Sequence, residues 1–411
     1  MCVYDEQELR NIVFGTSVFN DRSVLVPGYI PSTLTEVMHR NEIIHDYVMS
    51  IRSIVSNVVP TNLLLFGKSG TGKTMLTKLV ISNIANMAKE VGISTNLIAI
   101  QCESTKTDLE VVKSVIDHFE PTHDTNGTRI KRRLTHSYNA YFNYMTQLLR
   151  KHESNEITII FFDEVDKINN PNILNQFVRL KENGLTENNV CVICASNDSS
   201  FYKKLSYQTR NAFRKQMITF TPYTTSQLED ILRSRAEIAF KKDAITNDAI
   251  GLCAVLSAKY KGNARTAIEL LILAGDLADR IESNTVTFEL VNRADEENEE
   301  EHLSTIISTL PYHSKLLLFS HTNLTTRTKV DAPLLSDVIK LYNKICGEDG
   351  TKPLSNRRIY ELIDELIILG VLIDETISRG KKGGIQKKLK SIYTPEKMRE
   401  LISEKLKEEK L

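Results

Sequence analysis

The sequence predicts an α/β domain with a mostly parallel sheet, followed by an all-helical domain and then by a small domain of helices with one β-hairpin. Three observations support this fold class. Between residues 62 and 220, short apolar runs alternate with amphipathic stretches; after Pro222 the strand patterns stop; and two strand patterns return between residues 371 and 393. Strand–helix alternation is typical of α/β domains, and 411 residues suggest two to four domains.

Five short runs are the expected strands of the first domain. They are almost entirely apolar rather than alternating, which favours strands covered on both faces by helices. These runs are Asn62–Phe66, Asn96–Gln101, Ile157–Phe162, Val190–Ala195 and Met217–Phe220. The helical spacing between them predicts helices over Thr74–Glu90, Thr107–Phe119, Ser137–His152 and Pro171–Glu182. We therefore expect a parallel sheet sandwiched by helices.

The second half of the chain is predominantly helical. Helices are expected over Ser226–Phe240, Thr246–Tyr260 and Ala264–Ile281, with Ser226 and Thr246 as plausible caps, and again over Pro311–Ser320, Pro333–Cys346 and Ser355–Leu369. Two strands, Val371–Ser378 and Ile385–Tyr393, flank the turn Gly380–Gly384, and a charged helix or tail follows Pro395. Three helices and a basic-tipped hairpin describe a winged helix. The expected domains are residues 1–222, a helical domain 223–294, an acidic linker or solvated helix end 295–302, and a winged helix 303–411.

The net charge of zero hides a segregated charge distribution. The chain has 52 Lys and Arg residues against 52 Asp and Glu residues. Six acids lie between Asp295 and Glu301, whereas residues 376–393 hold six bases and no acid. A neutral sum therefore does not argue against a nucleic-acid partner here.

Other features of the composition exclude several classes of protein. No apolar run approaches the roughly 18 residues that a membrane span needs, and the acidic N-terminus does not resemble a signal peptide. Six scattered cysteines favour a reducing, intracellular setting over a disulfide framework. Cys191 and Cys194 form a CxxC on an expected strand, where this odd spacing sends the two sulfurs to opposite faces. A zinc site therefore has no support.

Gly67–Thr74 reads GKSGTGKT and satisfies the phosphate-loop pattern GxxxxGK[ST]. Its glycines let backbone N–H groups point at phosphate oxygens, Lys73 reaches the β- and γ-phosphates, and the Thr74 hydroxyl ligates Mg²⁺. The motif also lies between an expected strand and an expected helix, as this mechanism requires. The residues expected to contact nucleotide here are Gly67, Lys68, Ser69, Gly70, Thr71, Gly72, Lys73, Thr74 and Met75.

Polar residues follow the next two expected central strands. Asp163 is placed to hold Mg²⁺ together with Thr74, and Glu164 to polarise the attacking water. Asn197 is placed to orient that water beside the γ-phosphate, although a turn-forming Asn before Asp198 would look the same in sequence. Catalytic roles are therefore expected for Lys73, Asp163, Glu164, Asn197 and Arg265, with ATP or ADP and Mg²⁺ as cofactors.

Arginines outside the phosphate loop could sense the nucleotide. Arg265, in the sequence GNARTA, begins a helix of the second domain and could fold over the phosphates. Arg210 and Arg214 follow the Asn197 strand, where they could reach a neighbouring subunit's nucleotide. Plain surface arginines remain the alternative for each of the three.

These motifs together resemble the AAA+ ATPases, and a closer match is to archaeal origin-recognition/cell-division-control replication initiators. The match rests on four segments in the family's order: Gly28–Arg40, Phe220–Arg235, Gly262–Ala278 and Pro353–Leu372. The resemblance implies that Tyr223 and Arg235 line the adenine and phosphate side of the pocket, that Arg265 is the lid's sensor, and that residues 29–40 pack near the base. Asn211–Ala212 stand where the family usually has Ser-Ser or Ser-Arg, so Arg210 and Arg214 both remain candidates for an arginine finger.

Basic residues near the C-terminus indicate a DNA site. Arg357 and Arg358 lie in the first turn of the helix capped by Ser355, where cations are unfavourable unless an outside anion or base edge receives them. Arg379, Lys381 and Lys382 lie at the hairpin turn, against phosphate or in the minor groove. A protein-binding winged helix with a solvated hairpin is the alternative. Arg129 and Arg132, in RIKRR, form a further candidate contact or a solvated loop.

The resemblance implies an ATP-dependent replication initiator with a slow ATPase that serves as a switch. Its implied partners are double-stranded origin DNA, the replicative helicase and a paralogous initiator subunit, without a membrane, in the archaeal cytoplasm at the nucleoid. Two alternatives remain from sequence: an AAA+ remodeller or clamp-loader-type ATPase, and a nucleotide-regulated protein-binding adaptor.

Overall fold

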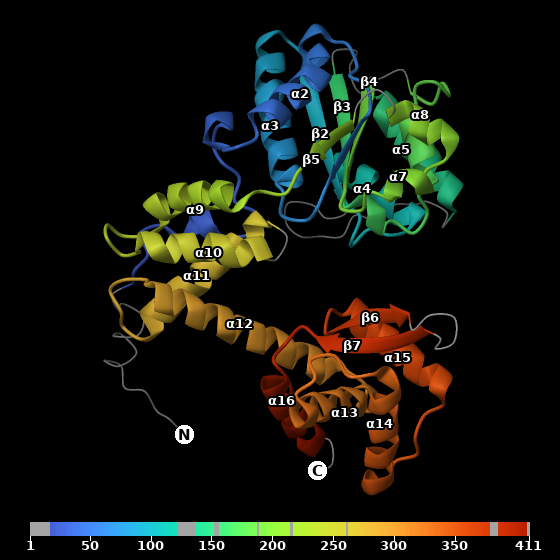
Figure 1. The fold of residues 1–411 in the computed structure, drawn as a ribbon. Coiled ribbons are helices and arrows are strands. Elements are labelled where there is room, and N and C mark those ends of the chain that lie inside the picture. The colour runs from blue at the N-terminus through green and yellow to red at the C-terminus, as the bar shows by residue number, and fades with distance from the viewer. Residues whose placement is uncertain are drawn as a thin grey trace, which may run out of the picture. The chain divides into compact units, whose positions relative to one another are not determined.

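The chain forms two compact units, residues 1–292 and 293–411 (Figure 1). A computed structural model describes residues 17–121, 137–151, 156–186, 189–213, 217–259, 262–378 and 385–408. Within these residues, no helix is both long enough and apolar enough to cross a membrane.

The first unit is built on a five-stranded, all-parallel sheet. The strands are β1 Leu63–Gly67, β2 Ser94–Gln101, β3 Glu156–Asp163, β4 Asn189–Ser196 and β5 Met217–Phe220, in the spatial order β2-β3-β4-β1-β5. The register pairs Gln101 with Asp163 and Phe66 with Ser196, so the carboxyl ends of the strands meet at one edge. All five predicted strands are present, each within two residues of the expected bounds.

Helices cover both faces of this sheet, as the unbroken apolar runs predict. One face packs against α2 (Asn41–Ile51) and α3 (Lys73–Glu90). The other packs against α4 (Asp108–Phe119), α5 (Tyr138–Arg150), α6 (Ile173–Val178), α7 (Phe201–Lys204) and α8 (Tyr207–Phe213). Cys191 lies in the first core and Cys194 in the second, which confirms that their sulfurs face opposite ways. Short 3-10 turns complete the domain: η1 Arg22–Leu25, η2 Leu34–Glu36, η3 Arg52–Ser56 and η4 Val165–Lys167.

Three helices form a lid within the same unit: α9 (Thr225–Ala239), α10 (Asn247–Lys259) and α11 (Ala264–Arg280). Residues 17–25 pack on the lid rather than on the sheet, since the Phe19 ring stacks near Phe240 and the Val18 N–H donates to Asp279. The chain then runs from the lid to α2, and we call residues 17–40 the strap. The domain predicted to span residues 1–222 thus includes a segment, residues 17–25, that packs against the lid.

Two predicted helix boundaries in this unit differ from the structure. Helix α9 is capped by Thr224 and not by Ser226, because Thr224 and Gln227 form a capping box that satisfies two backbone N–H groups. Helix α6 covers only six residues of the predicted Pro171–Glu182. Thr246 is a cap as predicted, with its hydroxyl accepting from the Ala249 N–H.

The acidic run 295–301 lies in the interior of one helix, α12 (Phe288–Thr309), rather than in a linker or at a helix end. Basic partners make this helical acidic run tolerable. Arg293 pairs with Glu297 at i,i+4, and Lys397 contacts both Glu300 and the carbonyl of Glu296. A charge run alone therefore did not indicate a break in secondary structure.

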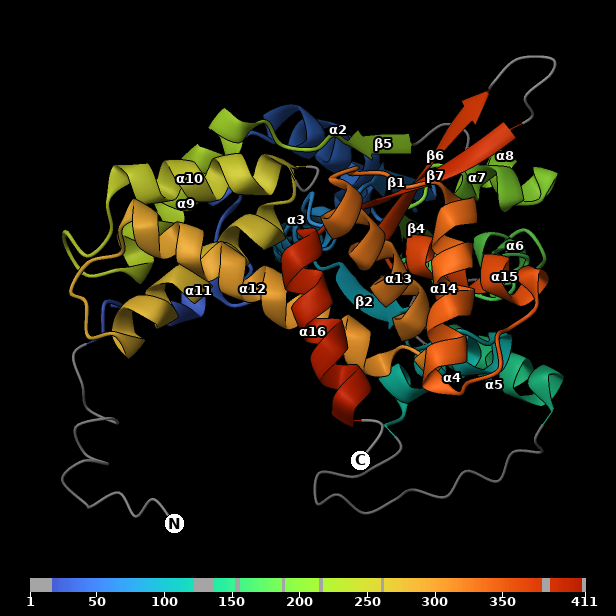
Figure 2. The same cartoon turned by 60° about the horizontal axis from the view of Figure 1, so that its bottom comes forward.

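The second unit has a core of its own, to which α12 contributes Leu303 and Ile307. Its other elements are α13 (Tyr312–Thr328), α14 (Leu335–Asp349), α15 (Asn356–Ile368), the antiparallel strands β6 (Leu372–Ser378) and β7 (Ile385–Ser391), and α16 (Pro395–Glu408) (Figure 2). Helix α13 extends eight residues beyond its predicted end at Ser320. The hydroxyls of Thr322, Thr325 and Thr326 donate to carbonyls of their own helix, which lets this polar stretch stay helical.

Candidate functional site

A pocket of about 360 Å³ lies at the carboxyl edge of the sheet, between the strap, the phosphate loop, the strand ends and the lid. This volume is within the range of small-molecule sites, which is roughly 300–1,000 Å³. Predicted site residues that line it are Ser69, Gly70, Gly72, Lys73, Thr74, Met75, Asp163, Glu164, Asn197, Tyr223, Arg235 and Arg265. Gly67, Lys68 and Thr71 are not among the residues that line it. Ligands in open α/β sheets bind at this edge of the strands.

Lys73 is the buried charge at the centre of the pocket, with only 6% of its surface exposed. Its Nζ donates to the carbonyls of Gly67 at 2.8 Å and Lys68 at 2.9 Å, and to Asn197 Oδ1 at 2.7 Å. Burial lowers the pKa of Lys73 to about 8, and the negative charge of Asp163 opposes this shift. Arg265 lies near enough that its charge lowers the same pKa further. The amine is therefore held by neutral oxygens, and the charges that act on it are the carboxylates of Asp163, Asp166 and Glu164 and the guanidinium of Arg265.

Two polar pairs sit beside this amine. The Thr74 hydroxyl donates to Asp163 Oδ2 at 2.7 Å, which brings together the two residues predicted to hold Mg²⁺. Hydroxyl and carboxylate oxygens are ligands that Mg²⁺ accepts. Asn197 Nδ2 donates to Glu164 Oε1 at 3.1 Å, and Glu164 adopts a left-handed backbone conformation with φ 51°. Asn197 thus links the lysine to the glutamate through the two ends of one amide.

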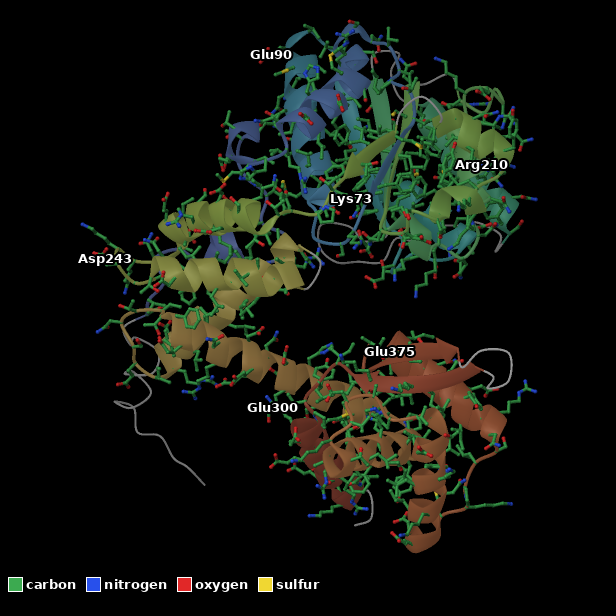
Figure 3. The ribbon with its side chains drawn as sticks, in the orientation of Figure 1. Lys73, Glu90, Arg210, Asp243, Glu300 and Glu375 are labelled. Carbon is green, nitrogen blue, oxygen red and sulfur yellow. The ribbon has the colours of Figure 1, made fainter. Side chains whose placement is uncertain are left out.

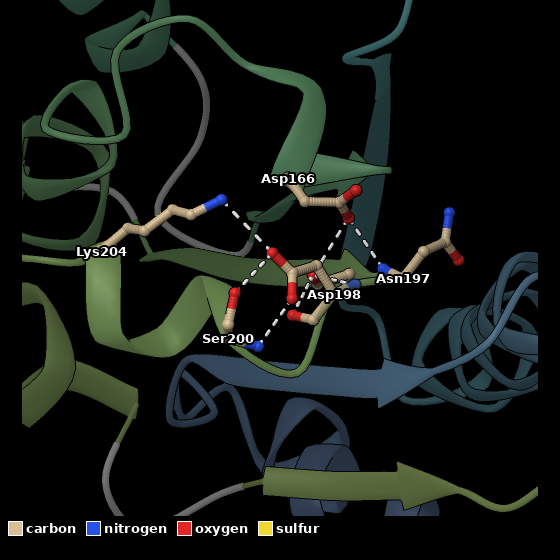
Figure 4. Close-up of polar contacts among 6 residues, drawn as sticks. Asp166, Asn197, Asp198, Ser200 and Lys204 are labelled. Atoms are coloured by element: carbon tan, nitrogen blue, oxygen red, sulfur yellow. Dashed lines mark hydrogen bonds and ion pairs between the residues drawn. The ribbon is translucent and has the colours of Figure 1, made fainter. Parts of the chain in front are cut away.

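Asp166 orients Asn197, and no predicted motif included it. Its Oδ1 accepts from the Asn197 N–H at 2.7 Å and from the Ser196 hydroxyl at 3.0 Å (Figure 4). The turn after β4 is formed instead by Asp198, which accepts from the N–H and hydroxyl of Ser200. Asn197 is therefore not the turn-forming residue of the alternative interpretation. No local pattern in the sequence indicates Asp166, because its bond to the Asn197 N–H depends on β3 and β4 being neighbours in the sheet.

The lid contacts the phosphate loop directly. The Ala264 N–H donates to the Gly70 carbonyl at 3.3 Å, and Asn263 caps α11 by accepting from the Arg265 N–H. Gly70 has a φ of +73°, and a Cβ added there would lie only 1.4 Å from Asn263 Oδ1. Gly70 is therefore needed both for the loop conformation and for the approach of the lid.

The apolar end of the pocket is formed by the strap and α9. Arg235 stacks over the Tyr29 ring at 4.1 Å and donates to the Val24 carbonyl at 3.3 Å. Burial lowers the pKa of Arg235. Tyr223 lines the pocket, while its hydroxyl accepts from Arg40 Nε at 3.0 Å. Arg40 is a second residue that the motifs did not single out, although it ends the family-like segment Gly28–Arg40.

The predicted arginine-finger candidates lie apart from the pocket lining. Arg210 is on α8, and Figure 3 shows it well away from Lys73 within the first unit. Its Nε is buried without a hydrogen-bond partner among the described residues. Arg214 lies outside the described residues, as do Arg129, Arg132, Arg379, Lys381 and Lys382.

Arg357 and Arg358 lie in the first turn of α15 as predicted, and both side chains already form ion pairs within that helix. Both contact Glu361 one turn later, Arg357 Nε at 3.3 Å and Arg358 Nη1 at 2.8 Å, and Glu365 lies 3.7 Å from Arg358. The hydrogen bond to Glu361 raises the pKa of Arg358. The arginines therefore have carboxylates of their own helix as partners, and their role as DNA contacts stays a prediction.

Replacing Gly70 by Ala is expected to destabilise the first unit more than replacing Gly28 by Ala. Both glycines have positive φ, so each substitution carries a backbone strain of about 1–2 kcal/mol. Nothing lies within 4 Å of a Cβ at Gly28, whereas Asn263 blocks the one at Gly70. Thermal and urea unfolding would measure the difference, expected to be roughly 1–3 kcal/mol. The double substitution Gly70→Ala with Asn263→Ala should recover part of it, and equal effects for the two glycines would contradict the contact.

Comparison with known proteins identifies the family of this chain. A Cdc6 AAA+ ATPase-type lid domain model matches residues 229–296, a CDC6 C-terminal winged helix domain model matches residues 305–401, and an ATPase domain predominantly from Archaea matches residues 48–252. The ORC1-type DNA replication protein of Pyrococcus abyssi is 31% identical over 388 residues, which cover 94% of this chain and 90% of that protein. The protein of the same description from Methanocorpusculum labreanum is 31% identical over 374 residues, covering 89% and 86%.

Solved structures agree with this similarity. The Aeropyrum pernix ORC1 protein in complex with DNA matches with a TM-score of 0.75 and 26% identity, covering 95% of this chain and 97% of that one. Cdc6p from Pyrobaculum aerophilum shares the fold, with a TM-score of 0.58 and 20% identity over 96% and 100% of the two chains. These similarities favour the initiator interpretation over the remodeller, clamp-loader and adaptor alternatives. With a phosphate loop, a lid and a winged helix in one chain, the protein belongs to the archaeal Orc1/Cdc6 family of AAA+ DNA replication initiators.

Proposed function

We propose that this chain binds ATP or ADP with Mg²⁺ in the pocket of its first unit and binds double-stranded origin DNA with its second unit. The observation that carries the nucleotide half is the set of contacts around Lys73. A buried amine held by neutral carbonyls, beside a Thr74–Asp163 pair and a Glu164–Asn197 pair, fits a polyphosphate, a divalent cation and a polarised water.

Each residue of the site has a role in this proposal. Lys73 exchanges the carbonyls of Gly67 and Lys68 for phosphate oxygens, and Arg265 adds a second positive charge from the lid. Thr74 and Asp163 would hold Mg²⁺, which would neutralise phosphate charge at this site. Among the described residues, no group of three or more His, Cys, Asp or Glu side chains is placed to hold a metal ion. Glu164 polarises the attacking water, and Asn197 positions Glu164.

We infer that hydrolysis is slow and serves as a switch. Asn197 Nδ2 donates to Glu164 Oε1, so in the free protein one oxygen of this carboxylate already accepts a hydrogen bond from the residue proposed to position it. The replicative helicase and a paralogous initiator subunit are the proposed protein partners, and the archaeal cytoplasm, at the nucleoid, is the proposed location. The identity of an arginine finger, Arg210 or Arg214, belongs to the same proposal.

The DNA half rests on the winged helix and on the Aeropyrum pernix ORC1 protein, which was solved in complex with DNA. Lys387, Lys388 and Lys390 follow one another along β7, and Arg357 and Arg358 stand at the N-terminus of α15. Lysines along a wing suit phosphate contacts, and arginines at the start of a recognition helix suit base edges. We propose that Arg379, Lys381 and Lys382 extend the phosphate-binding wing, and that Arg129 and Arg132 add contacts from the first unit.

The affinity for ATP should fall as the pH rises above 8. The pKa of Lys73 is lowered to about 8 by burial, so the amine loses its proton at higher pH in the free protein. Phosphate binding requires the protonated amine. Above pH 8 most of the free protein must therefore take up a proton on binding, and the affinity falls as the pH rises. Between pH 7 and pH 9 the loss should be about ten-fold, measured by titration calorimetry.

Lys73→Arg is the control for this dependence, because an arginine stays protonated throughout this range. Its ATP affinity, whatever its absolute value, should be flat between pH 7 and pH 9. Titration calorimetry of the wild type in buffers of different ionisation enthalpy measures the number of protons taken up on ATP binding. This gives a second readout of the protonation of Lys73. A wild-type affinity that does not change with pH would contradict the role of the buried amine, and Lys73→Ala should abolish binding.

The fragment 293–411 should bind duplex DNA weakly and with a strong dependence on salt. A fragment that begins at residue 303 would cut α12, leave the core residue Leu303 at its first position, and lose Glu296 and Glu300, which contact Lys397. Each phosphate contact adds roughly 0.9 to the slope of log affinity against log salt, so replacing Lys388 and Lys390 by Gln should reduce that slope by about two. Lys405→Gln on α16 is the control. A fragment that ignores DNA at low salt would remove the DNA half of the proposal.

Glu361→Gln should raise the affinity of the full chain for random-sequence duplex DNA. Glu361 engages both arginines of the α15 N-terminus, so its neutralisation frees them and removes a charge that repels phosphate. An increase of about two- to five-fold is expected from an exposed ion pair of this kind. Glu348→Gln changes the net charge equally but pairs with Lys344 on α14, so it should have a smaller effect. Equal effects of the two substitutions would mean that α15 does not approach the duplex.

A further inference from the structure

Arg40 is a buried cation whose hydrogen bonds all go to neutral oxygens. Only 4% of it is exposed. Nε donates to the Tyr223 hydroxyl at 3.0 Å, and Nη2 donates to the carbonyls of Thr71 at 3.1 Å and Thr221 at 2.8 Å. The guanidinium also stacks over the Tyr223 ring, 3.8 Å from its centroid. A buried charge without a carboxylate among these partners is costly, so a specific arrangement must favour an arginine at this position.

The partners of Arg40 belong to three different parts of the first unit. Thr71 is in the phosphate loop, Thr221 follows β5, and Tyr223 begins the chain that enters the lid. Arg40 itself ends the strap and precedes α2. The planar fork of one guanidinium therefore joins the phosphate loop to the base of the lid. Lysine, with a point charge, cannot make this forked set of bonds in the same geometry.

Tyr223 extends the connection into the lid. Its backbone N–H donates to the Gly262 carbonyl at 3.3 Å, and a Cβ at Gly262 would lie 2.4 Å from the Tyr223 carbonyl. Gly262 stands immediately before Asn263, which caps the helix that presents Arg265 to the pocket. A continuous set of contacts thus runs from Thr71 through Arg40, Tyr223 and Gly262 toward Arg265.

A direct contact between phosphate loop and lid exists beside this path. It includes the hydrogen bond from the Ala264 N–H to the Gly70 carbonyl at 3.3 Å and the packing of Asn263 on Gly70. Lys73 at present binds the carbonyls of Gly67 and Lys68, on the same loop as Thr71. When Lys73 turns to a phosphate, these carbonyls are released and the loop must settle around a new partner.

We propose that Arg40 is a positioning residue that couples the phosphate loop to the lid, so that nucleotide bound at Lys73 orders α9 and α11. Arg40 itself does not line the pocket, so it acts through Thr71 and Tyr223 rather than on the nucleotide. The inference rests on the proposed binding of nucleotide at this site. It adds the element that lets the lid respond to that binding.

The test compares the full-length wild type with Arg40→Met, Arg40→Lys and Tyr223→Phe. Hydrogen exchange of residues 225–239 and 264–280 is followed with and without Mg-ATP, and ATP affinity is measured in parallel. In the wild type, ATP should slow exchange in both lid helices. Arg40→Met should reduce this ATP-dependent protection, with a coupling loss of about ten-fold. Arg40→Lys should restore only part of it, and Tyr223→Phe should lose part, because its ring remains but its hydroxyl does not.

Arg22→Met is the matched control. Arg22 also lies on the strap, stacks over an aromatic ring, Phe19, and bonds to the lid through Asp276, but it makes no contact with the phosphate loop. It should leave the ATP-dependent protection unchanged. A general loosening of the lid would appear in Arg22→Met as well, and would appear without ATP.

Three outcomes would overturn the coupling, two of which concern protection of the lid at wild-type level. The first is a folded Arg40→Met protein that keeps wild-type ATP affinity and wild-type protection of the lid helices. The second, should Arg40→Met fail to fold, is wild-type protection in both Arg40→Lys and Tyr223→Phe. The third is an ATP affinity that falls in Arg40→Met with lid protection retained at saturation, which would show a local role for Arg40 without coupling. A wild type that binds no ATP would instead contradict the proposed function.

Discussion

The rest of the nucleotide site depends on the burial of one amine, that of Lys73. The sheet order β3-β4-β1 places the strands that lead to Asp163, Asn197 and Lys73 side by side, and the register aligns their carboxyl ends. Because the amine is buried, its N–H groups need hydrogen-bond acceptors within the protein. They donate to two carbonyls of the phosphate loop and to the side-chain oxygen of Asn197. The other polar contacts depend on Asn197. Its Nδ2 donates to Glu164, and its backbone N–H donates to Asp166.

In the free site, Lys73, Thr74 and Asn197 already have hydrogen-bond partners, and the cations Lys73 and Arg265 lie beside the carboxylates Asp163 and Glu164. The lysine, Arg265 and the N-terminus of α3 all contribute positive potential, while Thr74 and Asp163 hold each other in place. In the proposed nucleotide complex, phosphate oxygens would replace the carbonyl contacts of Lys73. The change on binding would then fall on the phosphate loop, which is also the element that the lid contacts at Gly70.

Local patterns in the sequence were enough to predict the strands, the phosphate loop and the acids after β3, because each of these features is encoded in fewer than ten consecutive residues. Arg40 and Tyr223 are 183 residues apart, and nothing in either neighbourhood indicates the other. Asp166 was missed for a different reason: its function is to bond a backbone N–H after a neighbouring strand, and such a contact depends on sheet order. The acidic run was misjudged because its stabilising partner, Lys397, lies 97 residues beyond Glu300.

Charge on α15 shows why composition alone cannot describe a DNA-binding surface. The helix carries two arginines against Glu361, Asp364 and Glu365, so by itself it does not attract a polyanion. In the proposed DNA-binding role, lysines such as those of β7 would attract phosphate and give affinity but no sequence information. The α15 arginines would then leave Glu361 only where a base edge offers bonds at least as good as those to the carboxylate. A recognition helix that first has to release its own ion pairs is poorly suited to non-specific binding, and that property would favour a protein that must find few sites among many.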